Sequence, residues 1–280
     1  RWVSRLGIPH VGIECAQQHR LLTSSTGALT VTIAILSAMP EELSAVLALM
    51  PDEQPKKVAG REFWCGHLQG HDVVAVLSRI GKVAAATTAT VLIEHFGVQR
   101  MVFTGVAGGL HPDVRVGDVV VASRFMQHDL DVSPLFPRYT VPYYGCDTFA
   151  ADIALSAALQ TAAGTVLQDP AAVLGAEAVQ TFNLNQARLH RGLVVSGDRF
   201  VATAAESNRL RSDLPEALVV EMEGAAVAQV CHDYGVPFAA VRTVSDRADD
   251  AAHVDFGRFL AQVASRYSAA TVNALLKVLS

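Results

Sequence analysis

The amino-acid sequence predicts an α/β fold in which helices pack on a largely parallel or mixed sheet. Short apolar runs rich in valine and isoleucine alternate with longer segments rich in alanine and leucine along most of the chain, a pattern typical of this class. The clearest unit begins at residues 218–220, an apolar run of the kind that forms a buried strand. Small residues from Gly224 onward then favour a helix packed tightly against the sheet.

The composition favours one large domain. The chain has 280 residues, of which 51% are hydrophobic, enough to bury a sizeable core. No linker rich in Pro, Gly or Ser divides residues 31–280, so we expect a single domain there, preceded by a flexible or peripheral extension over residues 1–30. The net charge is −5 with scattered Lys and Arg, which disfavours a nucleic-acid partner. We also expect no membrane partner, because no apolar run approaches the ~20 residues of a span.

Cysteines and histidines indicate neither a metal site nor a disulfide framework. The four cysteines are widely spaced and form no Cys-x-x-Cys pair, which fits a reducing, cytoplasmic location. His67 and His71 are four residues apart but lie in the turn-like segment 66–72 with no third ligand nearby, so a solvated loop is favoured over a metal pair. We therefore expect neither a metal nor a cofactor.

The remaining elements are predicted in chain order. Residues 31–36 form a strand and residues 40–50 a helix, because Pro40 suits a first helical turn and Glu41 and Glu42 suit its positive end. After them come a hairpin at 63–68 and 72–78, a long helix at 81–96, and a strand at 101–104 that ends in a glycine turn at 105–109. The second half contributes strands at 118–122, 193–196 and 236–244 and an amphipathic helix at 261–279. A less regular region is flanked by residues 151–162 and 186–192.

Acidic residues follow two successive predicted strands. Glu221 and Glu223 come directly after residues 218–220, and Ser245 and Asp246 end the strand at 236–244. Open α/β sheets bind ligands at the carboxyl ends of their strands. An unpaired buried carboxylate is costly, so these acids must be solvated, paired or used on a ligand. We therefore expect the functional site at this edge of the sheet.

Two glycine-containing turns could also approach a ligand. The segment 105–109 lacks the spacing Gly-x-Gly-x-x-Gly, and no acidic residue at ribose distance completes a dinucleotide fingerprint. It indicates only a backbone that comes close to a ligand or to another strand. The turn 196–201 adds Phe200, which either packs in the core, the commoner case, or stacks on a planar base.

Eight motifs keep a fixed order and together are highly specific. They are IAILSAMPEEL (33–43), IGKVAA (80–85), TGVAGGL (104–110), VGDVVV (116–121), HDLDV (128–132), VSGDRFV (195–201), VEMEGA (220–225) and VRTVSDRAD (241–249). On these motifs the sequence resembles the 5′-methylthioadenosine/S-adenosylhomocysteine nucleosidases, within the purine nucleoside phosphorylase and nucleosidase superfamily. The resemblance implies a three-layer α/β sandwich of the nucleoside phosphorylase type, with a central mixed, largely parallel twisted sheet flanked by helices.

The resemblance also implies a reaction, the hydrolysis of the N-glycosidic bond of methylthioadenosine and S-adenosylhomocysteine with release of adenine. By this analogy Asp246 protonates nitrogen 7 of adenine, and Glu42 takes the proton from water. Glu223 accepts hydrogen bonds from the ribose hydroxyls. Arg242 and Ser245 would orient the acids.

The other contacts implied by the resemblance are apolar or come from the backbone. Met222 would lie under the sugar and Phe200 against adenine. Gly108 and the Val201 backbone would approach the substrate. Ile80 and Phe256 match apolar wall positions, which suits a thioether better than a phosphate. The partners implied are an adenine nucleoside and water, and a second copy of the chain in a homodimer. In that dimer the apolar segment 132–149 would help to close the neighbour's pocket.

Departures from the family pattern keep alternatives open. Val106 stands where members often carry a hydroxyl residue, Pro40 replaces an acid, and segment 135–148 differs in composition, which bears on the preference for the 5′ substituent. One alternative is a purine nucleoside phosphorylase, or a nucleosidase with another 5′ or base preference; a phosphate site would need hydroxyl and Arg donors, which Ala38 and Val106 do not supply. The other alternative is a non-catalytic nucleoside-binding protein. Such a protein need not keep Glu42 and Asp246 together, and the presence of both disfavours it.

Overall fold

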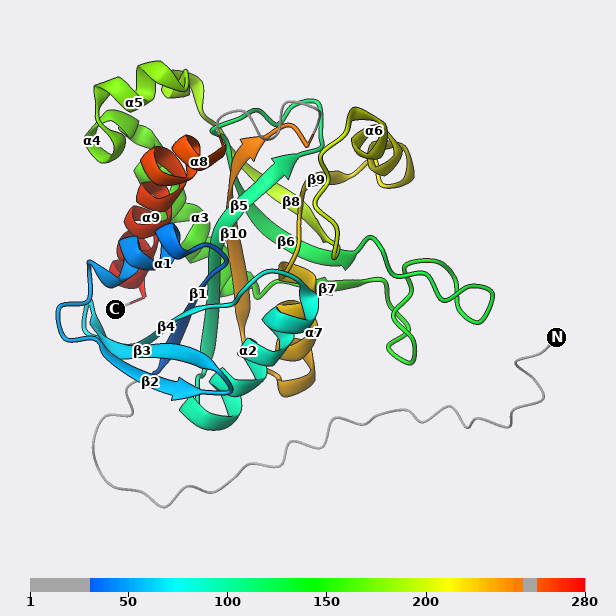
Figure 1. Cartoon of the computed structure of the whole chain (residues 1–280), viewed down its shortest axis with the longest axis horizontal. Coiled ribbons are helices and arrows are strands. Elements are labelled where there is room, and N and C mark those ends of the chain that lie inside the picture. Colours follow the sequence, from blue (N-terminus) through cyan, green and yellow to red (C-terminus); the bar gives the residue numbers. More distant parts are fainter. Residues whose placement is uncertain (1–30, 249–255, 280) are drawn as a thin grey trace.

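The computed structural model describes residues 31–248 and 256–279, and the expectation for residues 1–30 lies outside them. Its described strands form one ten-stranded mixed sheet (Figure 1). The strands are β1 (Ile33–Ser37), β2 (Gln54–Val58), β3 (Arg61–Leu68), β4 (His71–Leu77), β5 (Arg100–Gly109), β6 (Val119–Gln127), β7 (Thr148–Ala150), β8 (Leu189–Ser196), β9 (Ala217–Glu221) and β10 (Phe238–Asp246). The α/β class and the mixed sheet predicted from the sequence are confirmed.

The central strands of the sheet are parallel, and at one side of the sheet the strands close into a ring. β1 lies parallel to both β4 and β5, and β5 is also parallel to β10. β10 continues antiparallel to β6, which is parallel to β8, and β8 is parallel to β9. β9 returns to pair antiparallel with β5, so that five strands form a closed ring. The carboxyl ends of β1, β5 and β10 therefore meet at one edge of the sheet.

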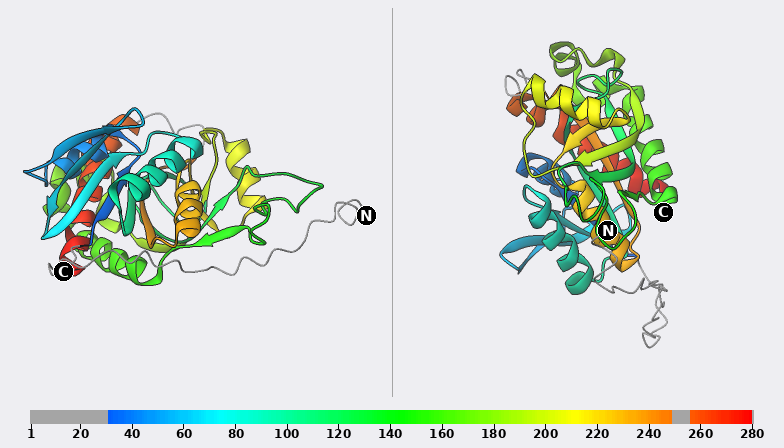
Figure 2. Two further views of the ribbon diagram at one scale, coloured as in Figure 1. Left: turned by 90° about the horizontal axis from the view of Figure 1, so that it is seen from below. Right: turned by 90° about the vertical axis from the view of Figure 1, so that its right-hand side faces the viewer.

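Helices cover both faces of the sheet. Those described are α1 (Pro40–Leu47), α2 (Lys82–Phe96), α3 (Ile153–Gln168), α4 (Pro170–Leu174), α5 (Ala176–Thr181), α6 (Ala204–Asp213), α7 (Gly224–Tyr234), α8 (Phe256–Phe259) and α9 (Ser265–Val278). α2 packs beside α7 on one face, and α1 and α3 pack against α9 on the other (Figure 2). Every residue of β1 and β10 is buried, as expected for strands covered on both sides. Within the described residues, no helix is both long and apolar enough to cross a membrane.

The predicted glycine turn at 105–109 is wrong, because β5 continues through these residues to Gly109. The glycines are needed where other groups come close to the strand. A Cβ at Gly105 would lie 3.3 Å from Nη1 of Arg242, and a Cβ at Gly108 only 2.9 Å from the Cβ of Ala248. The segment thus marks a close approach of neighbouring chain, which is one of the two meanings that the sequence left open.

The hairpin of β3 and β4 is confirmed, but a third strand on its outer side was not predicted. β2 reads Gln-Pro-Lys-Lys-Val and is exposed at four of its five positions. It lacks an apolar pattern because it is the last strand of the sheet, where lysine and proline protect an open edge. The C-terminal helix begins earlier than predicted, at Phe256, and contains a π-helical turn at Leu260–Ala264.

Candidate active site

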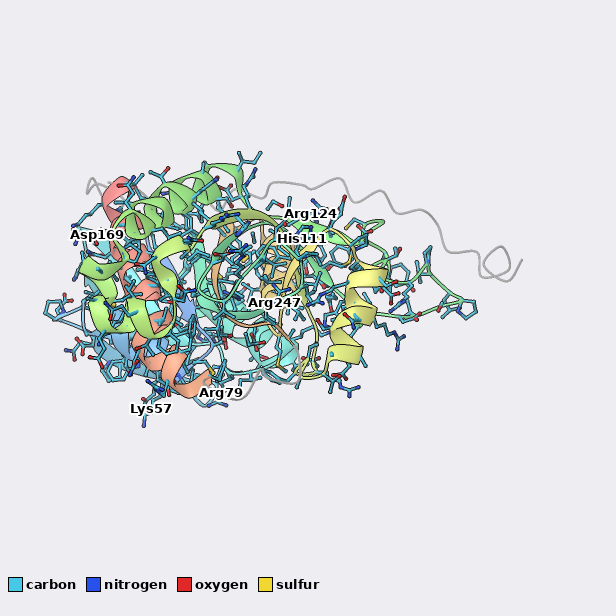
Figure 3. All side chains as sticks on the ribbon, turned by 90° about the horizontal axis from the view of Figure 1, so that it is seen from above. Lys57, Arg79, His111, Arg124, Asp169 and Arg247 are labelled. Carbon is cyan, nitrogen blue, oxygen red and sulfur yellow. The ribbon has the colours of Figure 1, made fainter. Side chains whose placement is uncertain are left out.

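A cavity opens at the carboxyl edge of the sheet, the edge that faces the viewer in Figure 3. Its walls come from the ends of β1, β5, β9 and β10 and from the loops that follow β4 and β8. All site residues predicted from the sequence line it except Glu42 and Arg242; the lining set is Ala38, Met39, Ile80, Val106, Ala107, Gly108, Arg199, Phe200, Val201, Val220, Glu221, Met222, Glu223, Ser245, Asp246 and Phe256.

Asp246 is held in the cavity wall by its own neighbours in the chain. The Oγ of Ser245 donates to Oδ2 of Asp246 at 2.7 Å, and the backbone N–H of Ala248 donates to Oδ1 at 2.7 Å. A Cβ at Gly108 would lie 3.0 Å from Oδ1, so glycine leaves room for the carboxylate there. Asp246 is 8% exposed. One carboxylate with fixed orientation therefore faces the cavity, and Ser245 is the residue that orients it.

Glu223 approaches the cavity from the start of α7. It is 5% exposed, and its Oε1 accepts a hydrogen bond of 2.8 Å from the backbone N–H of Gly81. Burial, and then the nearby carboxylate of Glu221, raise the pKa of Glu223 to about 7. A carboxyl group with this pKa accepts hydrogen bonds when ionised and also donates one when protonated.

Arg242 orients Glu221, a carboxylate to which the sequence assigned no specific role. Nη2 of Arg242 donates to Oε2 of Glu221 at 2.7 Å, and its guanidinium stacks on the Phe103 ring at 4.2 Å. Glu221 also accepts from the Gly224 backbone N–H at 2.9 Å and from the Ser196 hydroxyl. Both acids after residue 220 therefore line the cavity, and Glu221 is the one that is paired with a cation. The signal for this pair was Arg242 itself, the one cation inside a mostly apolar strand.

Glu42 lies behind the cavity wall, in the first turn of α1. Its side chain is fully buried; Oε2 accepts from the Met39 backbone N–H at 3.2 Å, while Oε1 has no partner among the described residues. Burial raises the pKa of Glu42 to about 7, against the opposing effect of the positive charge of Arg242. Ala38 and Met39, which precede Glu42, line the cavity. A carboxylate with a pKa near neutrality is well matched to accepting a proton at neutral pH.

Apolar side chains form the rest of the cavity wall. Ile80 is 60% exposed and Phe200 is 44% exposed, although both line the cavity. For Phe200 this exposure disfavours a core position. Met222, Val201 and Phe256 complete the apolar surface. The cavity therefore combines a few fixed carboxyl groups with apolar walls, as small-molecule sites commonly do.

A charged clamp joins the two loops that carry the apolar walls, and the sequence had given its members no role. The Lys82 backbone N–H donates to Oδ1 of Asp198 at 2.7 Å, and the Asp198 backbone N–H donates to Oδ2 of Asp129 at 2.8 Å. The Lys82 ammonium also pairs with Asp129. Asp198 lies two residues before Phe200, and Lys82 follows the Gly81 that binds Glu223. The available signal was that the three residues lie in three separate motifs of the sequence.

Comparisons with known proteins agree with this geometry. The sequence profile of the phosphorylase superfamily matches residues 32–277. The 5′-methylthioadenosine/S-adenosylhomocysteine nucleosidase from Neisseria meningitidis, solved in complex with methylthio-immucillin-A, is 34% identical, with a TM-score of 0.77 over 88% of this chain and 98% of that one. The Streptococcus pneumoniae nucleosidase with a transition-state inhibitor is also 34% identical, with a TM-score of 0.76 over 89% of this chain and 100% of that one.

A third similar structure has another substrate in its name. The futalosine hydrolase of Helicobacter pylori is 32% identical and has a TM-score of 0.76 over 89% of this chain and 98% of that one. The fold of nucleoside phosphorylases predicted from the sequence is thus confirmed. The chain belongs to the phosphorylase superfamily and, within it, to the group of nucleosidases that these three enzymes represent.

Proposed function

We propose that the protein hydrolyses the N-glycosidic bond of 5′-alkylthio adenine nucleosides, methylthioadenosine and S-adenosylhomocysteine, to adenine and the 5-substituted ribose. The observation that carries the proposal is the placement of Asp246 and Glu223 on one apolar cavity, with Glu42 directly behind its wall. Similarity to two methylthioadenosine/S-adenosylhomocysteine nucleosidases supports the substrate class. The products are compounds that a cell recycles toward adenine nucleotides and methionine.

The reaction needs a general acid that protonates the leaving adenine, a general base that accepts a proton from water, and groups that hold the sugar in place. Asp246 donates a proton to nitrogen 7 of adenine, and the bond from C1′ to nitrogen 9 breaks with its electron pair leaving on the neutral base. Water adds to the cationic C1′ and loses its proton to Glu42. Glu223 holds the 2′ and 3′ hydroxyls of the ribose, and Met222 lies below the ring. No cofactor or metal enters these steps.

The alternative of a phosphorylase differs in the group that attacks the sugar. Phosphate would need several donors, and Ala38 and Val106 offer only backbone and methyl groups to the cavity. Glu42 and Glu223, when ionised, would also repel a phosphate dianion. At these positions the cavity therefore favours water as the attacking group.

A second candidate within the same reaction class is a futalosine hydrolase, which the 32% identity to the Helicobacter pylori enzyme favours. Both candidates share the cleavage of an N-glycosidic bond and differ in the substrate. A direct assay separates them. The purified protein is incubated with methylthioadenosine, S-adenosylhomocysteine, futalosine, adenosine, AMP and inosine, and the released base is measured by chromatography. We expect the two 5′-thio nucleosides to be cleaved fastest; cleavage of futalosine alone would select the second candidate.

The working form that we propose is a homodimer in the cytoplasm. Segment 132–149 exposes large apolar side chains, with Leu135 at 65% and Tyr143 at 77% exposed. Figure 1 shows this segment, in green, extending away from the sheet between β6 and β7. An apolar extension of this kind is suited to cover a second copy. In the described residues Cys65, Cys146 and Cys231 are free thiols, which suits a reducing compartment. Sedimentation at micromolar concentration tests the dimer, and a monomer with full activity would contradict it.

A further inference from the structure

A second cavity lies beside the active site and is positively charged. Its volume is about 400 Å³, within the range of roughly 300–1,000 Å³ found for small-molecule sites. We call it the cationic cavity; it is lined by the cations Lys57, Arg61 and Arg79, by Glu62, by the backbone of Gly60, and by the apolar side chains Leu43, Trp64 and Leu77. Figure 3 shows Lys57 and Arg79 close together at the margin of the edge that carries the active site.

The topology brings this cavity next to Ile80, part of the apolar wall that the family resemblance assigns to the 5′ substituent. β3 runs antiparallel to β4, with Phe63 opposite Val76, so the start of β3 lies beside the end of β4. Arg79 lines the cationic cavity, whereas the next residue, Ile80, lines the active site. The two cavities therefore share the loop that follows β4.

Helix α1 provides a second shared boundary. Met39, the N-cap residue before α1, lines the active site, and Leu43, whose backbone N–H donates to the Met39 carbonyl at 3.2 Å, lines the cationic cavity. Residues four apart on a helix lie on the same side, one turn above the other. One turn of helix thus separates the apolar wall of the active site from the cationic cavity. A substituent that leaves the active site between Met39 and Ile80 would reach the cations.

Within the part of the chain that the structure describes, the two arginines have unused donors and no acidic partner. Neither guanidinium forms an ion pair with a carboxylate of the described residues. Arg61 donates to the carbonyls of Ala59 at 3.0 Å and Ala84 at 3.2 Å, but its buried Nε has no partner in that part of the chain. Among the described residues, Arg79 donates to one carbonyl, that of Gly60.

The charges also repel one another. Burial, and then the neighbouring charge of Arg79, lower the pKa of Arg61. Glu62, the one acid among the described residues that line the cavity, pairs with Lys57 at 3.2 Å and so neutralises the third cation instead. The backbone of Arg79 has a φ of 65°, which is uncommon for a residue with a side chain and is often found at functional sites. An anion between the two guanidiniums would relieve their repulsion.

We propose that the cationic cavity binds the carboxylate at the far end of a 5′ substituent, and so favours nucleosides with an anionic tail over uncharged 5′-alkylthio nucleosides. This proposal rests on the proposed function and specifies its preferred substrate. Guanidinium groups suit a carboxylate because their planar donors match its two oxygens. The apolar Leu43 and Leu77 would contact the methylenes of the tail, and Glu62 would accept from an ammonium group on an amino-acid tail such as that of S-adenosylhomocysteine.

The test compares three nucleosides that share adenine and ribose. S-adenosylhomocysteine has a charged tail, 5′-butylthioadenosine an uncharged tail of similar length, and methylthioadenosine a single methyl group. Arg61→Gln and Arg79→Gln are made singly and together. Lys56→Gln is the control, because it removes a charge from the neighbouring strand β2 outside the cavity. We expect the double variant to lose about tenfold or more in kcat/KM for S-adenosylhomocysteine, mainly through KM, because charged hydrogen bonds are lost. The other two nucleosides should change less than about twofold.

The outcomes separate this proposal from the proposed function. Equal losses for all three nucleosides, or no loss for S-adenosylhomocysteine, would overturn the role of the cavity while hydrolysis stands. If the wild type releases no adenine from any of them, the proposed function fails, and calorimetric binding of the same three compounds then tests the cavity. In that case weaker binding of S-adenosylhomocysteine alone by the double variant supports the proposal, and unchanged binding overturns it.

Discussion

Nη2 of Arg242 lies 2.7 Å from Oε2 of Glu221, and both side chains are at most 2% exposed. The pair joins β10 to β9 directly beneath the cavity, and the guanidinium also donates to the carbonyl of Phe103 on β5 at 3.1 Å. It therefore ties together the three strands whose ends form the cavity floor. Glu221 in turn accepts from the N–H of Gly224, where α7 begins.

Breaking this pair from one side should destabilise the protein strongly. Glu221→Gln leaves the charge of Arg242 buried without a partner, and such losses cost about 3–5 kcal/mol. Urea denaturation measures the effect. Arg124→Gln is a matched control, because it breaks an exposed ion pair with Glu216 that should contribute less than about 1 kcal/mol. Equal effects of the two substitutions would contradict the structural role of the buried pair.

Asp246→Asn should leave the fold intact and reduce adenine release by about 10²- to 10⁴-fold, since an amide supplies no titrating proton to the leaving base. Ser245→Ala removes the 2.7 Å hydrogen bond to Asp246 and should have a smaller effect on kcat. Circular dichroism spectra of both variants check that they are folded. Turnover near that of the wild type by a folded Asp246→Asn protein would remove this residue from the mechanism.

The free energy of unfolding should fall as the pH rises from about 4.5 to about 7. Burial raises the pKa of Glu42 from 4.5 to about 7, so in this window the folded state holds a proton that the unfolded state has released. Raising the pH therefore favours unfolding until the folded group has also ionised. In Glu42→Gln the free energy of unfolding should fall less steeply over this pH range, and the fall that remains is due to Glu223. Identical pH profiles for wild type and variant would show that Glu42 titrates normally.

The clamp of Lys82, Asp198 and Asp129 should act on substrate binding more than on stability. Asp198→Asn weakens the hydrogen bond from the Lys82 N–H, which is 2.7 Å in the structure, and loosens the loop that carries Phe200. We expect KM to rise several-fold with a smaller change in kcat, because the acid Asp246 is untouched. Glu216→Gln, which breaks the exposed ion pair with Arg124, is the control. A loss confined to kcat would argue against a positioning role.

The sequence predicted the location of Glu223 and Asp246 because both follow apolar strands, and strand ends gather at one edge of a parallel sheet. It did not predict the Arg242–Glu221 pair, which depends on how β10, β5 and β9 are aligned across the sheet. The continuation of β5 through Gly109 was missed for the same reason, since the groups that crowd these glycines come from residues 242–248. β2 was missed because a polar edge strand carries no apolar pattern.

The nature of the sugar product tests the central claim most directly. Wild-type protein is incubated with methylthioadenosine in phosphate buffer, and the sugar is identified by mass spectrometry and phosphorus NMR. Hydrolysis predicts free 5-methylthioribose in amounts equal to adenine, at a rate that does not depend on phosphate, and loss of this product in Glu42→Gln. A ribose 1-phosphate derivative as the main product would contradict the assignment of water as the attacking group.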